Sequence, residues 1–184
     1  MKRIVFFLFI FLTSVVFSQR SKNFSLQVSG GPNIYFNNLE LYHDNVDVLN
    51  YSLYSKITWN TKYRLSFGIE AGYVRLYRVN DFSFATNAEI TMTAIPIQAV
   101  IQMKVYKQFY VAGTFGPSFI RNNITSLSGD QNTHSFSIAD ISLAIGYKRT
   151  FKNNLYLGTE IKHYYSSKAE DRNLSVPLIF GINF

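Results

Sequence analysis

Histidine, serine and glutamate occur close together near the C-terminal end of the chain, in the segment 163–170, which reads His-Tyr-Tyr-Ser-Ser-Lys-Ala-Glu. Hydrolases use these residue types for nucleophilic catalysis, in which histidine takes a proton from a serine within hydrogen-bond reach. His163 and Ser166 are three residues apart, and strand residues at an odd spacing point to opposite faces unless a bulge intervenes. We therefore expect no catalytic pair here. The other histidines, His43 and His134, are interpreted as surface residues.

A second group of candidate functional residues consists of charged residues that lie between apolar neighbours in the sequence. It comprises Lys56, Arg64, Glu70, Lys104, Asp140, Glu160 and Lys162. Charges taken out of bulk water must pair or stay hydrated, so we expect these side chains to form a network of ion pairs on one polar face. A proton or ion path along the same face is the alternative. No His, Asp and Glu cluster has the spacing of metal ligands, so the sequence predicts neither a metal site nor a cofactor.

The chain contains no cysteine, which excludes disulfides, thiolate metal sites and a lipid-modified N-terminal cysteine. Its formal net charge of +7 could suit nucleic acid or an anionic surface. Basic residues gather at three short turns: Lys62, Arg64, Lys104, Lys107, Lys148, Arg149 and Lys152. Acidic residues gather in longer segments instead, and no basic stripe carries interleaved base-stacking aromatics. We therefore expect no nucleic-acid partner and a difference in charge between the two ends of the molecule.

The N-terminus has the three parts of a secretory signal. Lys2 and Arg3 are basic, residues 4–12 are an unbroken apolar run, and small residues precede Gln19. The apolar run is too short to span a bilayer, although an uncleaved membrane anchor is the alternative. We predict cleavage after Ser18. This gives a signal peptide at 1–18 and a single domain at 19–184, because no linker divides the rest of the chain.

Strands must position the charged residues, because large apolar residues recur with a period of two along most of the chain. We predict eight strands. Their apolar rows span 24–36, 51–59, 63–73, 95–105, 109–119, 141–147, 155–161 and 174–184. Segments of about ten residues suit tilted transmembrane strands. After residue 12 no apolar run approaches the roughly 18 residues of a membrane helix, so any membrane span must consist of strands.

Alternation alone leaves open which face lies inside, because a soluble lipocalin-like barrel has the same period. The interior of an eight-stranded barrel is just wide enough for side chains and could not hold so many Phe, Tyr, Trp, Leu and Ile residues. The opposite face is mostly Gly, Ala, Ser and Thr with a few charges. We therefore expect the large residues to face lipid and the charged residues to lie in a narrow lumen.

Short and long connections alternate along the chain. The short ones are 60–62, 106–108 and 149–154, and the long ones are 37–50, 78–91, 121–135 and 166–173. This order is expected when both termini are periplasmic and the long loops are extracellular. Aromatic residues at both ends of the strands predict girdles at the two membrane interfaces.

With these features, the mature chain resembles the PorT-like outer-membrane β-barrel family and, more broadly, small OmpA-type barrels. The resemblance rests on the signal pattern, the Gly-Gly-Pro segment at 30–32 and the final strand 174–184, which ends in an aromatic residue. It implies an outer-membrane location, with lipid and lipopolysaccharide around the protein and assembly by the barrel assembly machinery. In such barrels the terminal Phe is the assembly signal, which would be the role of Phe184.

The leading hypothesis is a non-enzymatic integral outer-membrane barrel that presents its long loops for binding or for support of the envelope. The segment 163–170 resembles the His, Ser and Glu region of lipid A deacylase barrels, so a lipid A-modifying enzyme is one alternative. A narrow-pore channel is the other. The sequence names no partner for the loops.

Overall fold

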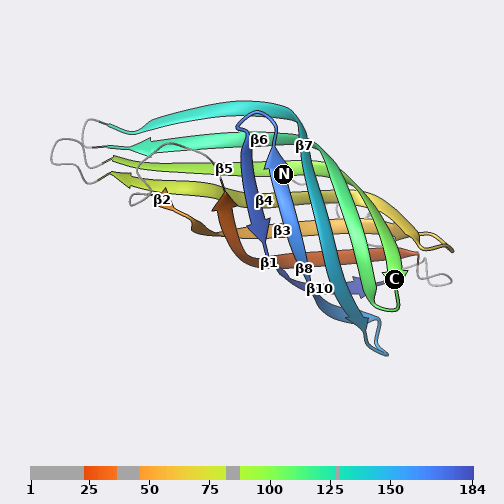
Figure 1. Ribbon diagram of the computed structural model, residues 1–184. Coiled ribbons are helices and arrows are strands. Elements are labelled where there is room, and N and C mark those ends of the chain that lie inside the picture. The colour runs from red at the N-terminus through yellow and green to blue at the C-terminus, as the bar shows by residue number, and fades with distance from the viewer. Residues whose placement is uncertain (1–22, 37–45, 82–87, 127–128) are drawn as a thin grey trace, which may run out of the picture.

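The computed structural model describes residues 23–36, 46–81, 88–126 and 129–184, which form one antiparallel sheet that closes on itself (Figure 1). Its strands are β1 (Phe24–Phe36), β2 (Val46–Asp47), β3 (Leu49–Asn60), β4 (Leu65–Asp81), β5 (Ala88–Tyr106), β6 (Phe109–Thr125), β7 (Gln131–Thr150), β8 (Leu155–Ser166), β9 (Asp171–Ser175) and β10 (Leu178–Asn183). Among the described residues, no helix is long and apolar enough to cross a membrane.

The barrel closes through the last part of the chain. Neighbours follow chain order from β1 through β3 to β8, and β9 and β10 each pair with β8 on one side and β1 on the other. These two strands therefore act as one, interrupted at Val176 and Pro177, where the proline has no N–H to donate. The predicted eight-stranded antiparallel barrel is confirmed, with its last strand divided in two.

The two faces of the wall differ as the size argument predicts. Large apolar side chains point outward, and the side chains buried in the lumen are mostly polar. The neighbours Ile69 and Glu70 illustrate the alternation, since they are 63 % and 2 % exposed. The apolar wall is a surface for lipid.

Some tyrosines depart from that prediction, because they lie inside: Tyr35, Tyr54, Tyr110, Tyr156 and Tyr164 are buried. Three of them lie directly opposite a glycine on the neighbouring strand, in the pairs Tyr54 with Gly72, Tyr110 with Gly146 and Tyr156 with Gly181. A Cβ built on any of these glycines would fall within 2.6 Å of the tyrosine ring. The missing side chains therefore make room for the rings. The hydroxyls of Tyr110 and Tyr156 donate to Glu160 Oε2 and to Leu26 O.

The long connections are shorter than predicted, because four strands continue beyond the barrel. β4 ends at Asp81 and β5 starts at Ala88, while β6 ends at Thr125 and β7 starts at Gln131. The segments 78–91 and 121–135 are therefore largely paired strand. Figure 1 shows β4 to β7 extending past the other strands as a projecting sheet. The short strand β2 pairs with β4 within this sheet, with Val46 opposite Val79.

Aromatic side chains lie at both ends of the apolar wall. At the projecting end, Tyr51 stacks on Tyr73, with ring centroids 5.8 Å apart. At the opposite end, where the short turns lie, Phe109 meets Tyr147 edge to face at 5.2 Å, and Trp59 is exposed. Such girdles are typical of the two membrane interfaces.

Candidate functional site

The centre of the lumen holds four charged side chains from β3, β4 and β8, each at most 3 % exposed. Lys162 donates a hydrogen bond to Glu70 Oε1. Lys56 Nζ lies 3.5 Å from Glu70 Oε2 and 3.7 Å from Glu160 Oε2. Two ammonium groups and two carboxylates therefore balance one another away from water, and each depends on the others for its solvation.

Two tyrosines also contact this central network. The Tyr110 hydroxyl donates to Glu160 Oε2 at 2.5 Å. Lys162 Nζ lies 3.8 Å from the centroid of the Tyr54 ring, whose π face attracts a cation. The network thus joins strands from opposite sides of the barrel across the lumen.

Asp140 lies in a separate buried cluster. Its carboxylate accepts hydrogen bonds from Tyr164 Oη, Ser137 Oγ and the backbone N–H of Ser167, the last at 2.9 Å. Among the described residues the partners of its carboxylate are hydroxyls and a backbone amide, and not the ion pairs expected from its charge. The carboxylate therefore ties the turn after β8 to β7 and satisfies polar groups that the turn would otherwise bury.

Arg64 and Lys104 also depart from the expectation, because the structure does not join them to the central network. Both side chains are exposed at the short-turn mouth, where Lys104 N donates to Arg64 O at 2.8 Å. The register carries their side chains to the same face, but the strands end here and the side chains reach water. Because water solvates these two charges, they do not need to pair with the acidic residues of the lumen.

Lys148 reaches into the lumen, although its sequence position suggested a turn residue. Its Nζ donates to Gln102 Oε1 at 3.0 Å and lies 4.4 Å from the Tyr110 ring centroid. Lys148 follows the inward residues Ala144 and Gly146 at an even spacing, so parity along β7 was the signal that could have identified it.

The histidine-containing segment offers no catalytic geometry. His163 is exposed on the outer face of β8, whereas Ser166 is buried, so the two side chains point to opposite faces as their spacing predicts. His134 is exposed on β7, and His43 lies outside the described residues. Within the described part of the chain, no group of three or more His, Asp or Glu residues lies close enough to hold a metal ion.

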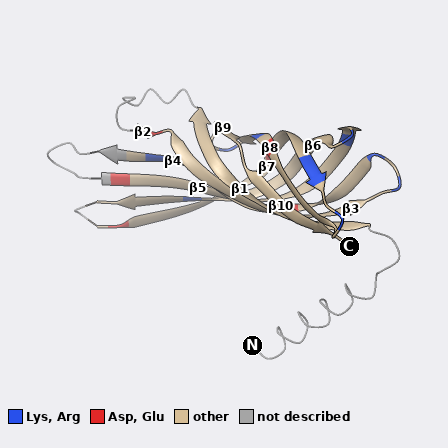
Figure 2. Cartoon of the chain, turned by 90° about the horizontal axis from the view of Figure 1, so that it is seen from below, with Lys and Arg blue, Asp and Glu red and all other residues tan. Residues whose placement is uncertain are grey.

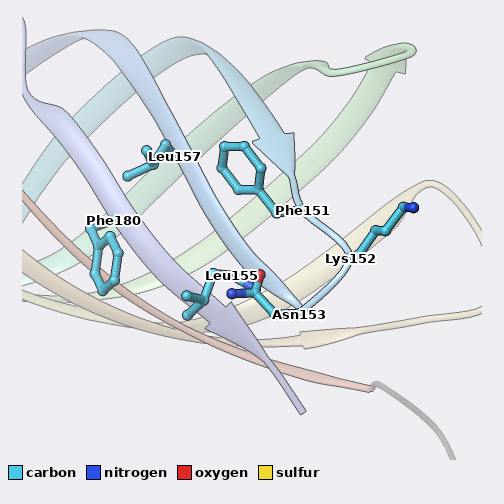
Figure 3. Close-up of a pocket in the computed structure, with 6 residues that line it drawn as sticks. All are labelled: Phe151, Lys152, Asn153, Leu155, Leu157 and Phe180. Carbon is cyan, nitrogen blue, oxygen red and sulfur yellow. The ribbon is translucent and has the colours of Figure 1, made fainter.

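The outer wall also carries a shallow apolar groove of about 450 Å³ near the turn between β7 and β8 (Figure 3). Phe151, Leu155, Leu157 and Phe180 line it, and the side chain of Lys152 extends from the turn away from them. The groove faces the surroundings of the barrel rather than its lumen, so it is a contact surface for lipid.

The chain matches the family model described as outer membrane protein beta-barrel domain over residues 7–184. Two similar solved structures are Ail, the attachment invasion locus protein of Yersinia pestis, and Neisserial surface protein A. Ail has a TM-score of 0.53 and 10% identity, with 89% of this chain and 100% of Ail covered. For the Neisserial protein the TM-score is 0.56 and the identity 13%, with 89% and 98% covered. No curated protein sequence matches this chain. At these identities the structures show a shared fold.

Proposed function

The chain belongs to the outer membrane protein β-barrel domain family, and from this premise we propose that it is a non-enzymatic surface protein whose projecting sheet binds a partner. The barrel is the membrane anchor, and the ends of β4 to β7 carry the binding surface. The opposed directions of His163 and Ser166 support a role without catalysis, because a lipid A deacylase of this type needs the two within reach of each other.

The observation that carries this proposal is the edge of the projecting sheet. Residues 131–137 of β7 pair with β6, whereas the pairing of β7 with β8 begins at Ile141. In the described part of the chain, the other side of this segment therefore has no strand partner. An edge of this kind presents free backbone N–H and C=O groups, which can pair with an extended polypeptide. On the far side of the sheet, β2 pairs with β4.

The test compares two single lysine substitutions in the same hairpin. Lysine on an edge strand opposes pairing with another strand. Thr133→Lys places it on the edge of β7. Thr125→Lys places the same charge on β6, one strand in from that edge, where residue 125 pairs with Glu89 of β5. Surface cross-linking on intact cells should capture at least tenfold less partner with Thr133→Lys and a normal amount with Thr125→Lys. If the two variants capture equal amounts of partner, the edge of β7 is not the binding surface.

The orientation proposed here places both termini in the periplasm and the projecting sheet outside the cell. The alternation of short and long connections supports it. Protease added to intact cells should then cut between β6 and β7, at 126–130, and leave the three short turns uncut. Cleavage at the short turns would reverse the orientation.

Two further parts of the proposal rest on sequence patterns. The signal pattern supports removal of residues 1–18, which lie outside the described residues, so N-terminal mass analysis should find Gln19 first and no retained Met1. Within the family, we propose that the chain is PorT-like, supported by the Gly-Gly-Pro segment at 30–32 and by the aromatic residue Phe184, which follows β10.

A further inference from the structure

The lumen ends at the short-turn mouth in a cavity of about 410 Å³, open to solvent. Four basic residues line it: Arg64, Lys104, Lys107 and Lys148. None of the described lining residues is Asp or Glu. Figure 2 shows Lys and Arg on the turns at this end of the barrel, where the C-terminus lies. We propose that this mouth, which we call the basic mouth, binds a phosphoryl group.

In the described part of the chain, none of the four basic residues of the mouth forms an ion pair. Arg64 and Lys104 lie side by side on neighbouring chain segments, joined by the bond from Lys104 N to Arg64 O. Like charges in directly opposite positions of a sheet destabilise it. The nearest lumen acids, Glu70 and Glu160, are already engaged by Lys56 and Lys162. An anion at the mouth would therefore remove a repulsion that the folded barrel otherwise carries.

Lys148 strengthens this inference from the inner side of the cavity. Its ammonium group is held by Gln102 Oε1 and the faces of Tyr110 and Tyr156, and in the described part of the chain no carboxylate lies within ion-pair distance of it. These direct partners are neutral, and they fix the position of the Lys148 side-chain nitrogen. An ammonium group held in this way is pre-organised to receive an anion.

A phosphoryl group fits the donors better than a single carboxylate does. It offers three strong acceptor oxygens, and guanidinium binds two of them in a planar fork while ammonium groups act as point charges. The cavity is large enough for on the order of ten water molecules, so a phosphoryl group fits together with the group that it substitutes.

The source of the phosphoryl group is either a lipid headgroup or a soluble phosphate compound. Arg64, Lys104 and Lys107 also border a second concavity of about 730 Å³, on the outer wall beside Leu65 and Val105. The apolar side chains of Leu65 and Val105 are outward-facing, where acyl chains would lie. The same cations can therefore be approached from the membrane or from the aqueous mouth.

The experiment uses the purified full-length protein in a non-ionic detergent at low salt, with inorganic pyrophosphate as the soluble probe and calorimetry as the readout. The test variant is Arg64→Gln/Lys104→Gln. The control is Arg149→Gln/Lys152→Gln, which removes the same charge from the same end of the barrel at residues that do not line the cavity. We expect saturable binding that weakens at least tenfold in the test variant and less than twofold in the control. A normal heat-dependent shift in gel mobility shows that each variant is folded.

A parallel arm identifies the source. The protein is reconstituted with phosphatidylglycerol, washed in detergent, and the phospholipid that stays bound is measured by mass spectrometry. Retention of lipid that is lost only in the Arg64→Gln/Lys104→Gln variant assigns the site to a headgroup, whereas saturable pyrophosphate binding alone assigns it to a soluble compound. If neither probe binds, or if both double variants weaken binding equally, the basic mouth is only a diffuse surface charge and the proposal is overturned.

Discussion

Glu70 is the residue on which the central network depends most, because it accepts from Lys162 and faces Lys56 at 3.5 Å. Glu70→Gln keeps the shape of the side chain but leaves two buried ammonium groups with one carboxylate, which costs about 3–5 kcal/mol in unfolding free energy. Urea titration in detergent micelles measures this loss. The matched control is Glu89→Gln, in an exposed ion pair, which should cost less than about 1 kcal/mol. Equal losses in the two variants would show that the lumen charges are well hydrated.

Gly146 is a position where a single methyl group should be costly. A Cβ at this residue would lie 2.4 Å from the Tyr110 ring, whose hydroxyl bonds to Glu160. Gly146→Ala should therefore reduce stability by about 1–3 kcal/mol through overpacking, and most of that loss should vanish when Tyr110 is replaced by Ala. A double-mutant cycle by urea titration gives the coupling. Additive effects would mean that the ring does not depend on the space above Gly146.

The sequence predicted the positions of these residues better than their partners. Parity along each strand places Lys56, Glu70, Glu160 and Lys162 on the inner face, because side chains alternate. Parity does not say that Lys162 on β8 reaches Glu70 on β4, since that contact crosses the lumen and depends on strand tilt and shear. For the same reason Asp140 could be placed inside without a prediction that hydroxyl groups and a backbone N–H would surround it.

For whole strands, too, the sequence predicted one part of the structure better than another. The apolar rows predicted the part of each strand that lies against lipid, because only there does one face differ sharply from the other. In the projecting sheet both faces meet water, the alternation fades, and the strands from 78 to 81 and from 131 to 135 were predicted as loop. Inward tyrosines were missed because their accommodation depends on a glycine in the neighbouring strand, which a one-strand pattern does not contain.

The projecting sheet should respond weakly to acid. Arg78 Nη2 donates to Glu89 Oε2 at 2.8 Å between β4 and β5, and this bond lowers the pKa of Glu89 below its ordinary value of 4.5. A lowered carboxyl pKa means that the stabilisation is complete above pH 4.5 and is lost as the pH falls through the lowered value. Both side chains are more than a third exposed, so the effect stays below about 1 kcal/mol.

Hydrogen exchange of the backbone amides at 78–81 and 88–91 measures this effect. Protection should decrease between pH 6 and pH 3, after correction for intrinsic exchange rates, and Glu89→Gln should remove the pH dependence. A decrease of the same size in the Glu89→Gln variant would assign the pH dependence to another group.

The last residue of the barrel closes the seam between β10 and β1. Phe184 and Phe24 exchange two backbone hydrogen bonds, at 2.9 and 3.0 Å, and their rings stack with centroids 6.3 Å apart. Deleting Phe184 should therefore lower the amount of folded, heat-modifiable barrel while export continues, whether the residue acts through this seam or as the proposed assembly signal. Phe180→Ala on the same strand, where the ring faces outward, is the control and should assemble normally. Normal assembly of the truncated chain would exclude both roles.

At the scale of the whole molecule, closure of the ring and filling of the lumen have a common consequence for transport. The largest fully buried side chains include Tyr54 on β3, Gln98 on β5, and Lys162 and Tyr164 on β8. Gln98 donates to Asp140 O at 3.0 Å and accepts from Thr114 at 2.6 Å, so the cross-section between the two charged clusters is also bridged. Eight-stranded barrels hold side chains rather than a water column.

Liposomes that contain the purified protein should therefore pass no small sugars, and planar bilayers should show no steady openings. Glu70→Gln should lower thermal stability before it produces conductance, because the tyrosine rings still obstruct the lumen when one charge is lost. A variant with Tyr54, Tyr110 and Tyr164 all replaced by Ala is the informative comparison, since it removes the bulk and leaves the four central charges in place. Conductance in that variant alone would show that the rings close the barrel. Large, steady openings from the wild-type protein would exclude the filled lumen and make a narrow-pore channel the leading hypothesis.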